Sequence, residues 1–283
     1  MKAGFKAELT KKLKILLMVT FSGCVVVPTV AAAAIDKSEA HVQADATQND
    51  CVVLLHGLAR SHHSMTPLKK SLSHEGYYVV NSEYNSLDAP IEQLAPRAID
   101  SALGQCPQGS NEIHFVTHSL GGILVRQYLQ QAQSVSPNQR AKIGRVVMLG
   151  PPNQGSELVD KFVTIPGFNT LNGFAGRQLG TDENSTPNRL KRIDVELGII
   201  AGSKSINPIL SLLLPGQDDG KVTIESTKLD GMADHLILPT THTFMMRNPA
   251  VLAQVHHFLA NGKFDGDFQH ANKAAAYSNN HIR

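Results

Sequence analysis

The chain has no tryptophan, few other aromatic residues and no marked excess of charge of either sign. Its 283 residues include 5 Tyr and 10 Phe, with 26 Lys and Arg against 24 Asp and Glu. No basic stripe interleaved with aromatic residues is present, which argues against nucleic-acid binding. After residue 34, no apolar stretch is long enough for a membrane span. The composition therefore favours neither a nucleic-acid-binding protein nor a protein built within a bilayer.

Residues 1–34 have the pattern of a secretory signal peptide. A lysine-rich start is followed by an apolar stretch at 15–27 and by four alanines at 31–34, which offer a small-residue cleavage site. The alternative is a lipobox at Phe21-Ser22-Gly23-Cys24, which would make Cys24 a lipid-modified N-terminus. Because apolar residues continue past Cys24, ordinary cleavage is favoured. We expect export to the periplasm or the medium, and a slightly negative net charge once the leader lysines are removed.

Cysteine is scarce, and only Cys51 and Cys106 remain after the leader. An exported chain meets an oxidising compartment, so a disulfide between the two is plausible. Cys51 begins a predicted strand and Cys106 lies just before another, so neighbouring strands would bring both to one end of a sheet. Two buried free thiols are the alternative.

Apolar runs alternate with helical patterns along most of the chain. Strands are predicted at 51–55, 77–80, 113–117, 143–149, 195–201 and 235–238, and helices at 65–74, 91–103, 119–131 and 249–259. This alternation predicts an α/β fold, with a mostly parallel sheet and helices on both faces. The folded domain would span 51–264, after a flexible lead-in at 35–50 and before a polar tail at 265–283.

A long segment at about 156–194 interrupts the alternation. It combines four glycines with Phe162, Phe168, Leu171 and Phe174. Insertions of this length in a compact domain are usually functional. We expect a cap over a hydrophobic pocket, with a pair of ordinary surface helices as the alternative.

The segment Thr117-His118-Ser119-Leu120-Gly121-Gly122 lies where a predicted strand meets a predicted helix. This layout is typical of a nucleophile elbow, a sharp turn that exposes a serine hydroxyl and needs small neighbours. Thr117 stands where the first glycine of the elbow is usual. The alternative is that Ser119 only caps the helix.

A serine nucleophile needs a histidine base oriented by a carboxylate, here in the chain order Ser, Asp, His. We predict Asp219 as the acid, because Gly220 permits a tight turn after it, with Asp218 as the alternative. We predict His242 as the base, because it follows the last strand. His235, His256 and His257 are the alternatives.

An acyl-transfer intermediate also needs two donors to its oxyanion. The N–H groups of Leu120, directly after the serine, and of Leu58, after the first buried strand, are the candidates. His56 is expected to shape the Leu58 loop through hydrogen bonds and not to act as the base.

These segments resemble the α/β-hydrolase superfamily, and within it the bacterial triacylglycerol lipase and esterase group. The resemblance covers about 51–264 and includes residues 52–58, 115–122, Asp219-Gly220, His242 and the Pro-x-x-Gly-Ser stretch within 148–156. It implies a Ser119–His242–Asp219 triad that hydrolyses esters without an organic cofactor. No acidic cluster suited to the structural calcium of some lipases is present, so we predict no metal.

The leading hypothesis is a serine carboxylester hydrolase that forms an acyl-enzyme on Ser119, with esters of moderate or long acyl chains as substrates. An acyltransferase using the same triad and a non-catalytic secreted binding protein are the alternatives. The expected partner is a small-molecule or lipid ester, with contact to a lipid interface as a further expectation. Neither nucleic acid nor an obligate protein partner is expected.

Overall fold

The computed structural model describes residues 49–131 and 142–267. Six strands form one sheet in the order β2-β1-β3-β4-β5-β6, and every neighbouring pair is parallel. The strands are β1 (Cys51–Leu55), β2 (Tyr78–Asn81), β3 (Ile113–His118), β4 (Ile143–Leu149), β5 (Leu197–Gly202) and β6 (Asp234–Leu238). All six predicted strands are present, each with bounds within about two residues of the prediction. The predicted leader with Cys24, the lead-in up to residue 48 and the tail from residue 268 lie outside the described residues.

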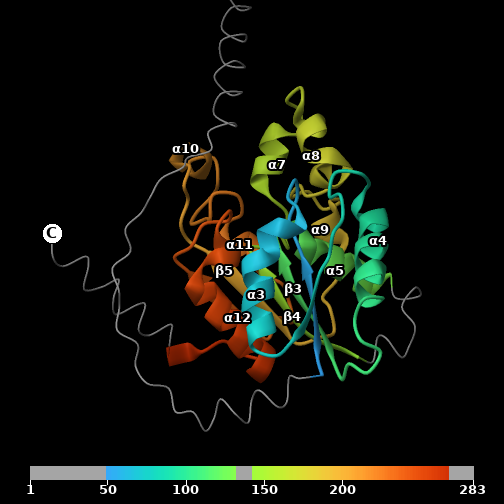
Figure 1. The fold of residues 1–283 in the computed structure, drawn as a ribbon. Helices are drawn as coiled ribbons and strands as arrows, with labels where there is room; N and C mark the ends of the chain where they lie inside the picture. The colour runs from blue at the N-terminus through green and yellow to red at the C-terminus, as the bar shows by residue number, and fades with distance from the viewer. Residues whose placement is uncertain (1–48, 132–141, 268–283) are drawn as a thin grey trace, which may run out of the picture. The chain divides into compact units, whose positions relative to one another are not determined.

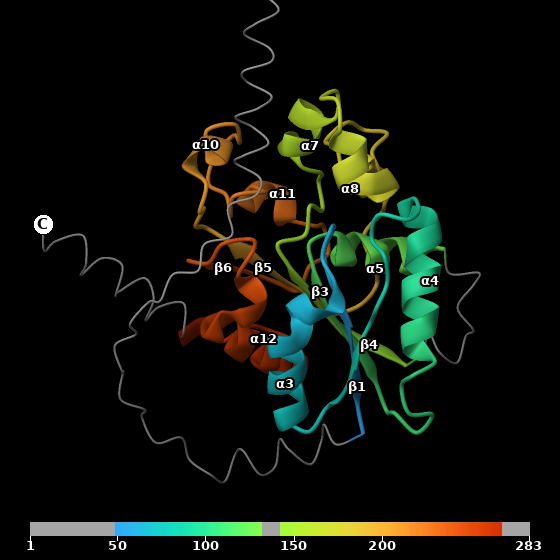
Figure 2. The same ribbon diagram turned by 45° about the horizontal axis from the view of Figure 1, so that its top comes forward.

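Helices cover both faces of the sheet, as the sequence predicts (Figure 1). One face carries α3 (Thr66–His74), which follows the short η1 (His62–Met65), together with α12 (Pro249–Asn261). The other carries α4 (Ile91–Leu103) and α5 (Leu120–Gln130), as Figure 2 shows. Because both faces are covered, β1 is an unbroken apolar run with every side chain fully buried. Each large aliphatic side chain buried in this way contributes about 1.5–3 kcal/mol.

The two cysteines form a disulfide, with 5.8 Å between their Cα atoms. Cys51 begins β1 and pairs with Ile113, the first residue of β3, while Cys106 lies in the turn between α4 and β3. The disulfide therefore ties the amino-terminal end of a central strand to the end of α4. The predicted pairing of Cys51 with Cys106 is confirmed.

The insertion between β4 and β5 forms three short helices, and the first two lie at the carboxyl-terminal end of the sheet (Figures 1 and 2). They are α7 (Glu157–Phe162), α8 (Phe168–Arg177) and α9 (Thr186–Arg189). α8 kinks at Gly173, whose φ is 62° and where a Cβ would lie 2.5 Å from the carbonyl oxygen of Leu87. Only glycine allows this conformation and this close approach together. The insertion therefore packs tightly on the loop after β2.

A second excursion, at residues 203–233 between β5 and β6, contains two more short helices. These are α10 (Pro208–Ser211) and α11 (Ile224–Thr227). Each begins with a capping side chain: Asn207 accepts from the N–H groups of Ile209 and Leu210, and Thr223 accepts from that of Ser226. A short η2 (Met245–Arg247) follows β6. In residues 49–131 and 142–267, no helix has the length and hydropathy to cross a membrane.

Candidate active site

Ser119 lies in a strained turn between β3 and α5. Its φ of 52° and ψ of −119° are uncommon for a residue with a side chain, and such strain gathers at functional sites. Its side chain makes no capping hydrogen bond to α5, although the residue occupies the N-cap position. The helix-cap explanation for this serine is therefore not supported by the geometry.

The small residues after Ser119 allow α5 to start directly against the sheet. A Cβ at Gly121 would lie 2.6 Å from the carbonyl oxygen of Leu55, at the end of β1. One at Gly122 would lie 3.1 Å from the sulfur of Met148. Thr117, at the position where glycine is usual, is fully buried, and its hydroxyl donates to the carbonyl of Val147 at 3.5 Å.

His242 and Asp219 form a buried pair from two different loops at this edge. His242 Nδ1 and Asp219 Oδ2 are 2.7 Å apart, and both residues are almost completely buried. The other carboxylate oxygen, Oδ1, accepts the N–H groups of Lys221 at 3.0 Å and Val222 at 2.9 Å. These donors fix the plane of the carboxylate, so Oδ2 points at the imidazole.

The neighbouring carboxylate, Asp218, faces elsewhere. Its Oδ1 accepts the hydroxyl of Ser211 at 2.8 Å and the N–H of Gly220 at 2.6 Å. Of the two candidate acids, Asp219 is thus the one that contacts His242.

His118 joins the elbow to the His242 loop. Its Nε2 lies 2.9 Å from the carbonyl oxygen of His242, and the two rings are 4.7 Å apart. Burial, followed by the nearby His242, holds the pKa of His118 well below its ordinary value. A neutral ring that donates from Nε2 fits this contact. The sequence placed His118 only in or beside a strand, so this bridge between Ser119 and His242 was missed.

The loop after β1 packs against the elbow. A Cβ at Gly57 would lie 2.8 Å from His118 Nδ1 and 3.1 Å from the Cβ of Ser119. Leu58 follows directly, and its side chain lies under α8, where a Cβ at Gly176 would come within 2.9 Å of it. Leu120 begins α5, so its N–H has no acceptor within the helix. The two candidate oxyanion donors therefore lie on segments that flank Ser119.

His56 contacts the backbone on both sides of this loop. Its ring nitrogens lie 2.9 Å from the carbonyl oxygen of Gly57 and 3.1 Å from that of Tyr84, and the ring stacks on Tyr84 at 4.0 Å. Burial lowers the pKa of His56. These contacts are those of a residue that shapes the loop.

The alternative histidines have other partners. His235 lies 2.9 Å from the hydroxyl of Thr227, His256 lies 2.7 Å from that of Ser71, and His257 donates to the carbonyl of Lys263 at 2.8 Å. Within the part of the chain that the structure describes, none of the three hydrogen bonds to Asp218 or Asp219.

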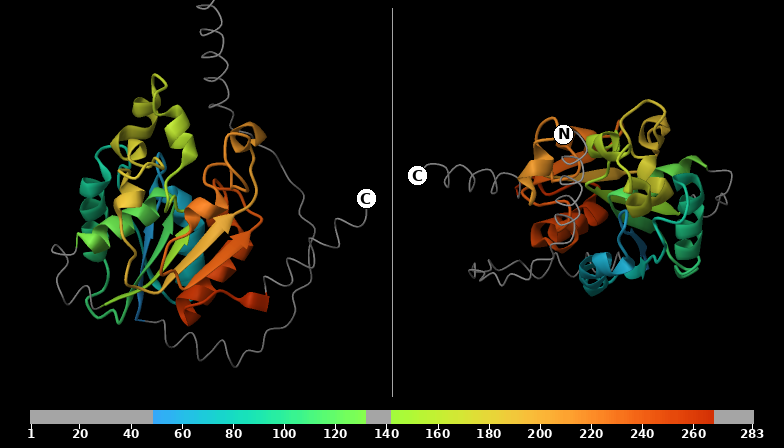
Figure 3. Two further views of the ribbon diagram at one scale, coloured as in Figure 1. Left: turned by 180° about the vertical axis from the view of Figure 1, so that it is seen from behind. Right: turned by 90° about the horizontal axis from the view of Figure 1, so that it is seen from above.

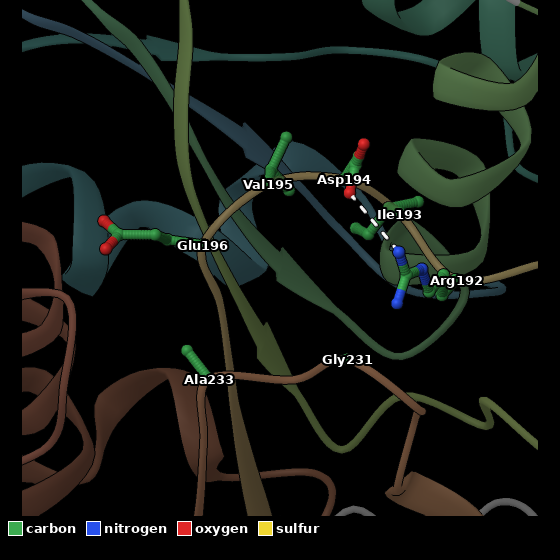
Figure 4. Close-up of a pocket in the computed structure, with 7 residues that line it drawn as sticks. All are labelled: Arg192, Ile193, Asp194, Val195, Glu196, Gly231 and Ala233. Carbon is green, nitrogen blue, oxygen red and sulfur yellow. Dashed lines mark ion pairs between the residues drawn. The ribbon is translucent and has the colours of Figure 1, made fainter.

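A pocket of about 380 Å³ lies away from these residues (Figure 4). It is lined by residues 192–196 with Gly231 and Ala233, which directly precede β5 and β6, so it opens at the amino-terminal edge of the sheet. Its charged side chains include an ion pair between Arg192 and Asp194 at 4.0 Å, and its lining has neither a serine nor a histidine. The candidate chemistry therefore lies at the opposite edge, where β3, β5 and β6 end.

Within residues 49–131 and 142–267, no three His, Cys, Asp or Glu side chains gather closely enough to hold a metal ion. The buried Asp219 carboxylate is instead occupied by the imidazole and by two backbone donors.

No protein-family model and no curated protein matches the sequence. Several solved structures do match its fold. Phospholipase PlaB from Legionella pneumophila aligns with a TM-score of 0.60 at 16% identity, over 76% of this chain and 60% of that one. Lipase BlEst2 from Bacillus licheniformis, in its propeptide form, aligns with a TM-score of 0.54 at 18% identity, over 71% and 48%. The metagenomic carboxyl esterase MGS0156 aligns with a TM-score of 0.54 at 19% identity, over 69% and 65%.

The alignments span from about half to two thirds of the length of these three proteins. At identities below one fifth, the likeness concerns the backbone and not the chemistry. The parallel six-stranded sheet, its two helical layers and these structural matches show that the chain has the α/β-hydrolase fold.

Proposed function

We propose that the chain is a serine carboxylester hydrolase whose nucleophile is Ser119. The observation that carries this proposal is the buried contact of 2.7 Å between His242 and Asp219, in a loop whose His242 carbonyl contacts His118, the residue before the serine of a strained strand-to-helix turn. A carboxylate that orients an imidazole next to a serine is the arrangement that activates a hydroxyl for acyl transfer. The structural matches to proteins described as a lipase, a phospholipase and a carboxyl esterase support the same reaction class.

In the proposed reaction, Ser119 Oγ adds to the carbonyl carbon of the ester while His242 Nε2 takes the hydroxyl proton. The N–H groups of Leu58 and Leu120 donate to the oxyanion that forms. When the tetrahedral intermediate collapses, the bond to the alcohol breaks and His242 returns its proton to the leaving oxygen. Water then repeats these steps on the acyl-enzyme, releasing the acid and the free serine. Asp219 accepts the Nδ1–H throughout and stabilises the imidazolium.

We further propose that the insertion at 156–194 caps the acyl-binding side of the site. Leu58, which carries one proposed oxyanion donor, lies directly under α8, and α8 exposes Leu171 and Phe174. In this proposal, the apolar side chains of the insertion favour esters with apolar acyl chains. The disulfide between Cys51 and Cys106 fits an exported protein, because such bonds persist in oxidising compartments.

A fluorophosphonate probe tests the nucleophile directly, because it reacts covalently with an activated serine. We expect labelling of the parent and loss of labelling in Ser119→Ala. Ser61→Ala is the matched control, since Ser61 is exposed on the loop after β1 at the same edge of the sheet, and it should label like the parent. Labelling that persists in Ser119→Ala would reject Ser119 as the nucleophile.

Turnover of p-nitrophenyl esters of increasing acyl length tests the substrate class. We expect hydrolysis that improves from short to moderate chains, because a longer chain reaches the apolar insertion. A folded protein that hydrolyses none of these esters would favour the non-catalytic binding protein instead.

A further inference from the structure

The side chain of His118, the residue directly before Ser119, reaches a segment that follows a distant strand of the sheet. Its Nε2 lies 2.9 Å from the carbonyl oxygen of His242. His118 ends β3, whereas His242 follows β6, and β4 and β5 lie between these two strands. In the view from behind, β5 and β6 lie in orange tones to one side of the blue and green strands (Figure 3). The contact therefore joins two segments that the order of the strands separates.

The other side of the His118 ring packs against the loop that carries the proposed oxyanion donor of Leu58. A Cβ at Gly57 would lie 2.8 Å from Nδ1 of the ring and 3.3 Å from its Cε1. A side chain at residue 57 would force the ring or the loop to shift, so glycine lets the two pack together. One buried side chain thus contacts both the oxyanion loop and the His242 loop, and it is joined in the chain to Ser119.

Both backbone groups of His242 are held by other parts of the proposed site. Its N–H donates to the carbonyl of Asp219 at 2.9 Å, and its carbonyl accepts from His118. The Asp219 carboxylate separately contacts Nδ1 of the His242 ring. Asp219 therefore orients the ring, whereas the position of the backbone from which the ring extends depends on His118 as well.

The contacts of the His118 ring determine where its proton lies. The carbonyl of His242 can only accept, so Nε2 must carry the hydrogen of this bond. Nδ1 is buried and has no hydrogen-bond partner among the residues that the structure describes. A second proton on Nδ1 would be buried without an acceptor, which costs free energy. These contacts define a neutral ring in a single tautomer.

Charged groups around the His118 ring also oppose its protonation. Desolvation is the largest cause of its lowered pKa, and His242, Arg60 and Lys221 each lower it further, against the hydrogen bond to the His242 carbonyl. The centres of the His118 and His242 rings are 4.7 Å apart. In the proposed reaction His242 becomes an imidazolium, which a charged neighbour at this distance would repel. A neutral His118 leaves His242 free to take the proton of Ser119.

We propose that His118 is a positioning residue, which holds the backbone of His242 so that its imidazole is aligned with Ser119. This role rests on the proposed function, since it concerns the same reaction. His118 touches neither the ester nor the transferred proton. It acts on the rate through His242, by a hydrogen bond that a neutral donor can make beside a ring that becomes charged.

Glutamine and methionine at residue 118 separate the hydrogen bond from the packing. The two side chains are similar in length, but only the glutamine amide can donate to the carbonyl of His242. We expect His118→Gln to turn over a p-nitrophenyl ester at a rate close to that of the parent. His118→Met should lower the turnover number by about 10²-fold with little change in KM, because a displacement of about 1 Å in a reacting group costs this much.

His114→Met is the matched control, because His114 is as buried as His118 but lies near the other end of β3. There its Nδ1 accepts the N–H of Arg145, away from the proposed site. This variant should lose stability in urea unfolding but keep its turnover number per folded molecule. Circular dichroism gives the folded fraction of each variant.

The outcomes separate the positioning role from the proposed function. A parent that neither reacts with the fluorophosphonate probe nor hydrolyses any ester would reject the function, and the positioning role with it. An active parent with equal turnover in His118→Gln and His118→Met would reject the positioning role alone. A loss of turnover in His114→Met as large as that in His118→Met would do the same, because it would reflect destabilisation only.

Nitrogen-15 NMR of the parent tests the position of the proton independently of the methionine variant. We expect the His118 ring to stay protonated on Nε2 alone across the pH range in which His242 titrates. A His118 ring that carries its proton on Nδ1, or that takes up a second proton in this range, would overturn the proposal.

Discussion

Asp218 and Asp219 are neighbours in the chain, but their carboxylates serve different elements. Asp218 accepts the hydroxyl of Ser211 at the end of α10, whereas Asp219 contacts His242. The difference follows from the tight turn at Gly220, whose φ of 97° turns the chain so that two successive N–H groups meet Asp219 Oδ1. The two residues are of the same type, so their different roles follow from the directions in which their carboxylates point.

We expect Asp219→Asn to lower the turnover number for a p-nitrophenyl ester by about 10³- to 10⁴-fold. The amide no longer stabilises an imidazolium, and it can hold the ring in the wrong tautomer. Asp218→Asn is the matched control and should change turnover far less, because its amide oxygen can still accept from Ser211. Steady-state kinetics on both folded variants measure the effect. The reverse ranking would transfer the role of the acid to Asp218.

The sequence could indicate Ser119, Asp219 and His242 as candidates because each follows a strand in a parallel sheet, and such loops meet at one edge. It could not indicate His118 as the residue that joins two of these loops. That contact joins a strand residue to the carbonyl group of a residue more than a hundred positions later, and no pattern in the sequence around either residue indicates it.

At the scale of elements, the start of α5 depends on how closely it meets β1. The carbonyl oxygen of Leu55 would lie only 2.6 Å from a Cβ on Gly121, so glycine at this position lets the helix begin at Leu120 without a clash. Both the direction of α5 and the turn that presents Ser119 depend on this close contact between α5 and β1.

Gly121→Ala should therefore lower the free energy of unfolding by about 1–3 kcal/mol through overpacking, or more if α5 cannot shift. Gly109→Ala is the control, since Gly109 has open space around it and should cost little. Urea unfolding followed by circular dichroism compares the two variants. Equal stability of Gly121→Ala and the parent would show that the backbones at this crossing are less constrained than their geometry implies.

The insertion is fastened to the domain by a fully buried arginine. Arg126, on α5, donates to the carbonyls of Asn153, Pro187 and Leu190, which lie before and near the end of the insertion. Burial lowers the pKa of this guanidinium to about 10, which still leaves it charged at neutral pH. A helical periodicity indicates that α5 is buried, but not that one of its buried positions carries a charge.

The strands and the long helices could be predicted because a buried strand is a short apolar run and a covered helix has apolar spacing. The helices of the 203–233 excursion could not. α10 and α11 have four residues each, too few for any period, and are held by the caps Asn207 and Thr223. The exposed Leu212 and Leu213, directly after α10, resemble core residues in sequence, so only the structure shows that they face outward.

At the scale of the whole molecule, several histidines are buried in their neutral form. His56, His114 and His118 are at most 1% exposed, and burial is the largest cause of the lowered pKa of each. They come from the loop after β1 and from both ends of β3, so they sample different parts of the sheet. Protonation of any of them therefore opposes the fold as a whole.

The free energy of unfolding should fall as the pH is lowered from 7 towards 5. In the unfolded chain these histidines take up protons near their ordinary pKa of 6.5, whereas in the folded chain they stay neutral to lower pH. The unfolded state then binds more protons, so stability that is present above pH 6.5 is lost below it, by up to about 1.4 kcal/mol per pH unit for each histidine.

His118→Gln should reduce the slope of unfolding free energy against pH by up to the contribution of one proton. The variant should still fold, since the glutamine amide can donate to the carbonyl of His242. His63→Gln, at an exposed histidine, is the matched control. Urea unfolding across this pH range measures the slopes, and a slope in His118→Gln as steep as that of the parent would mean that His118 is already protonated in the fold.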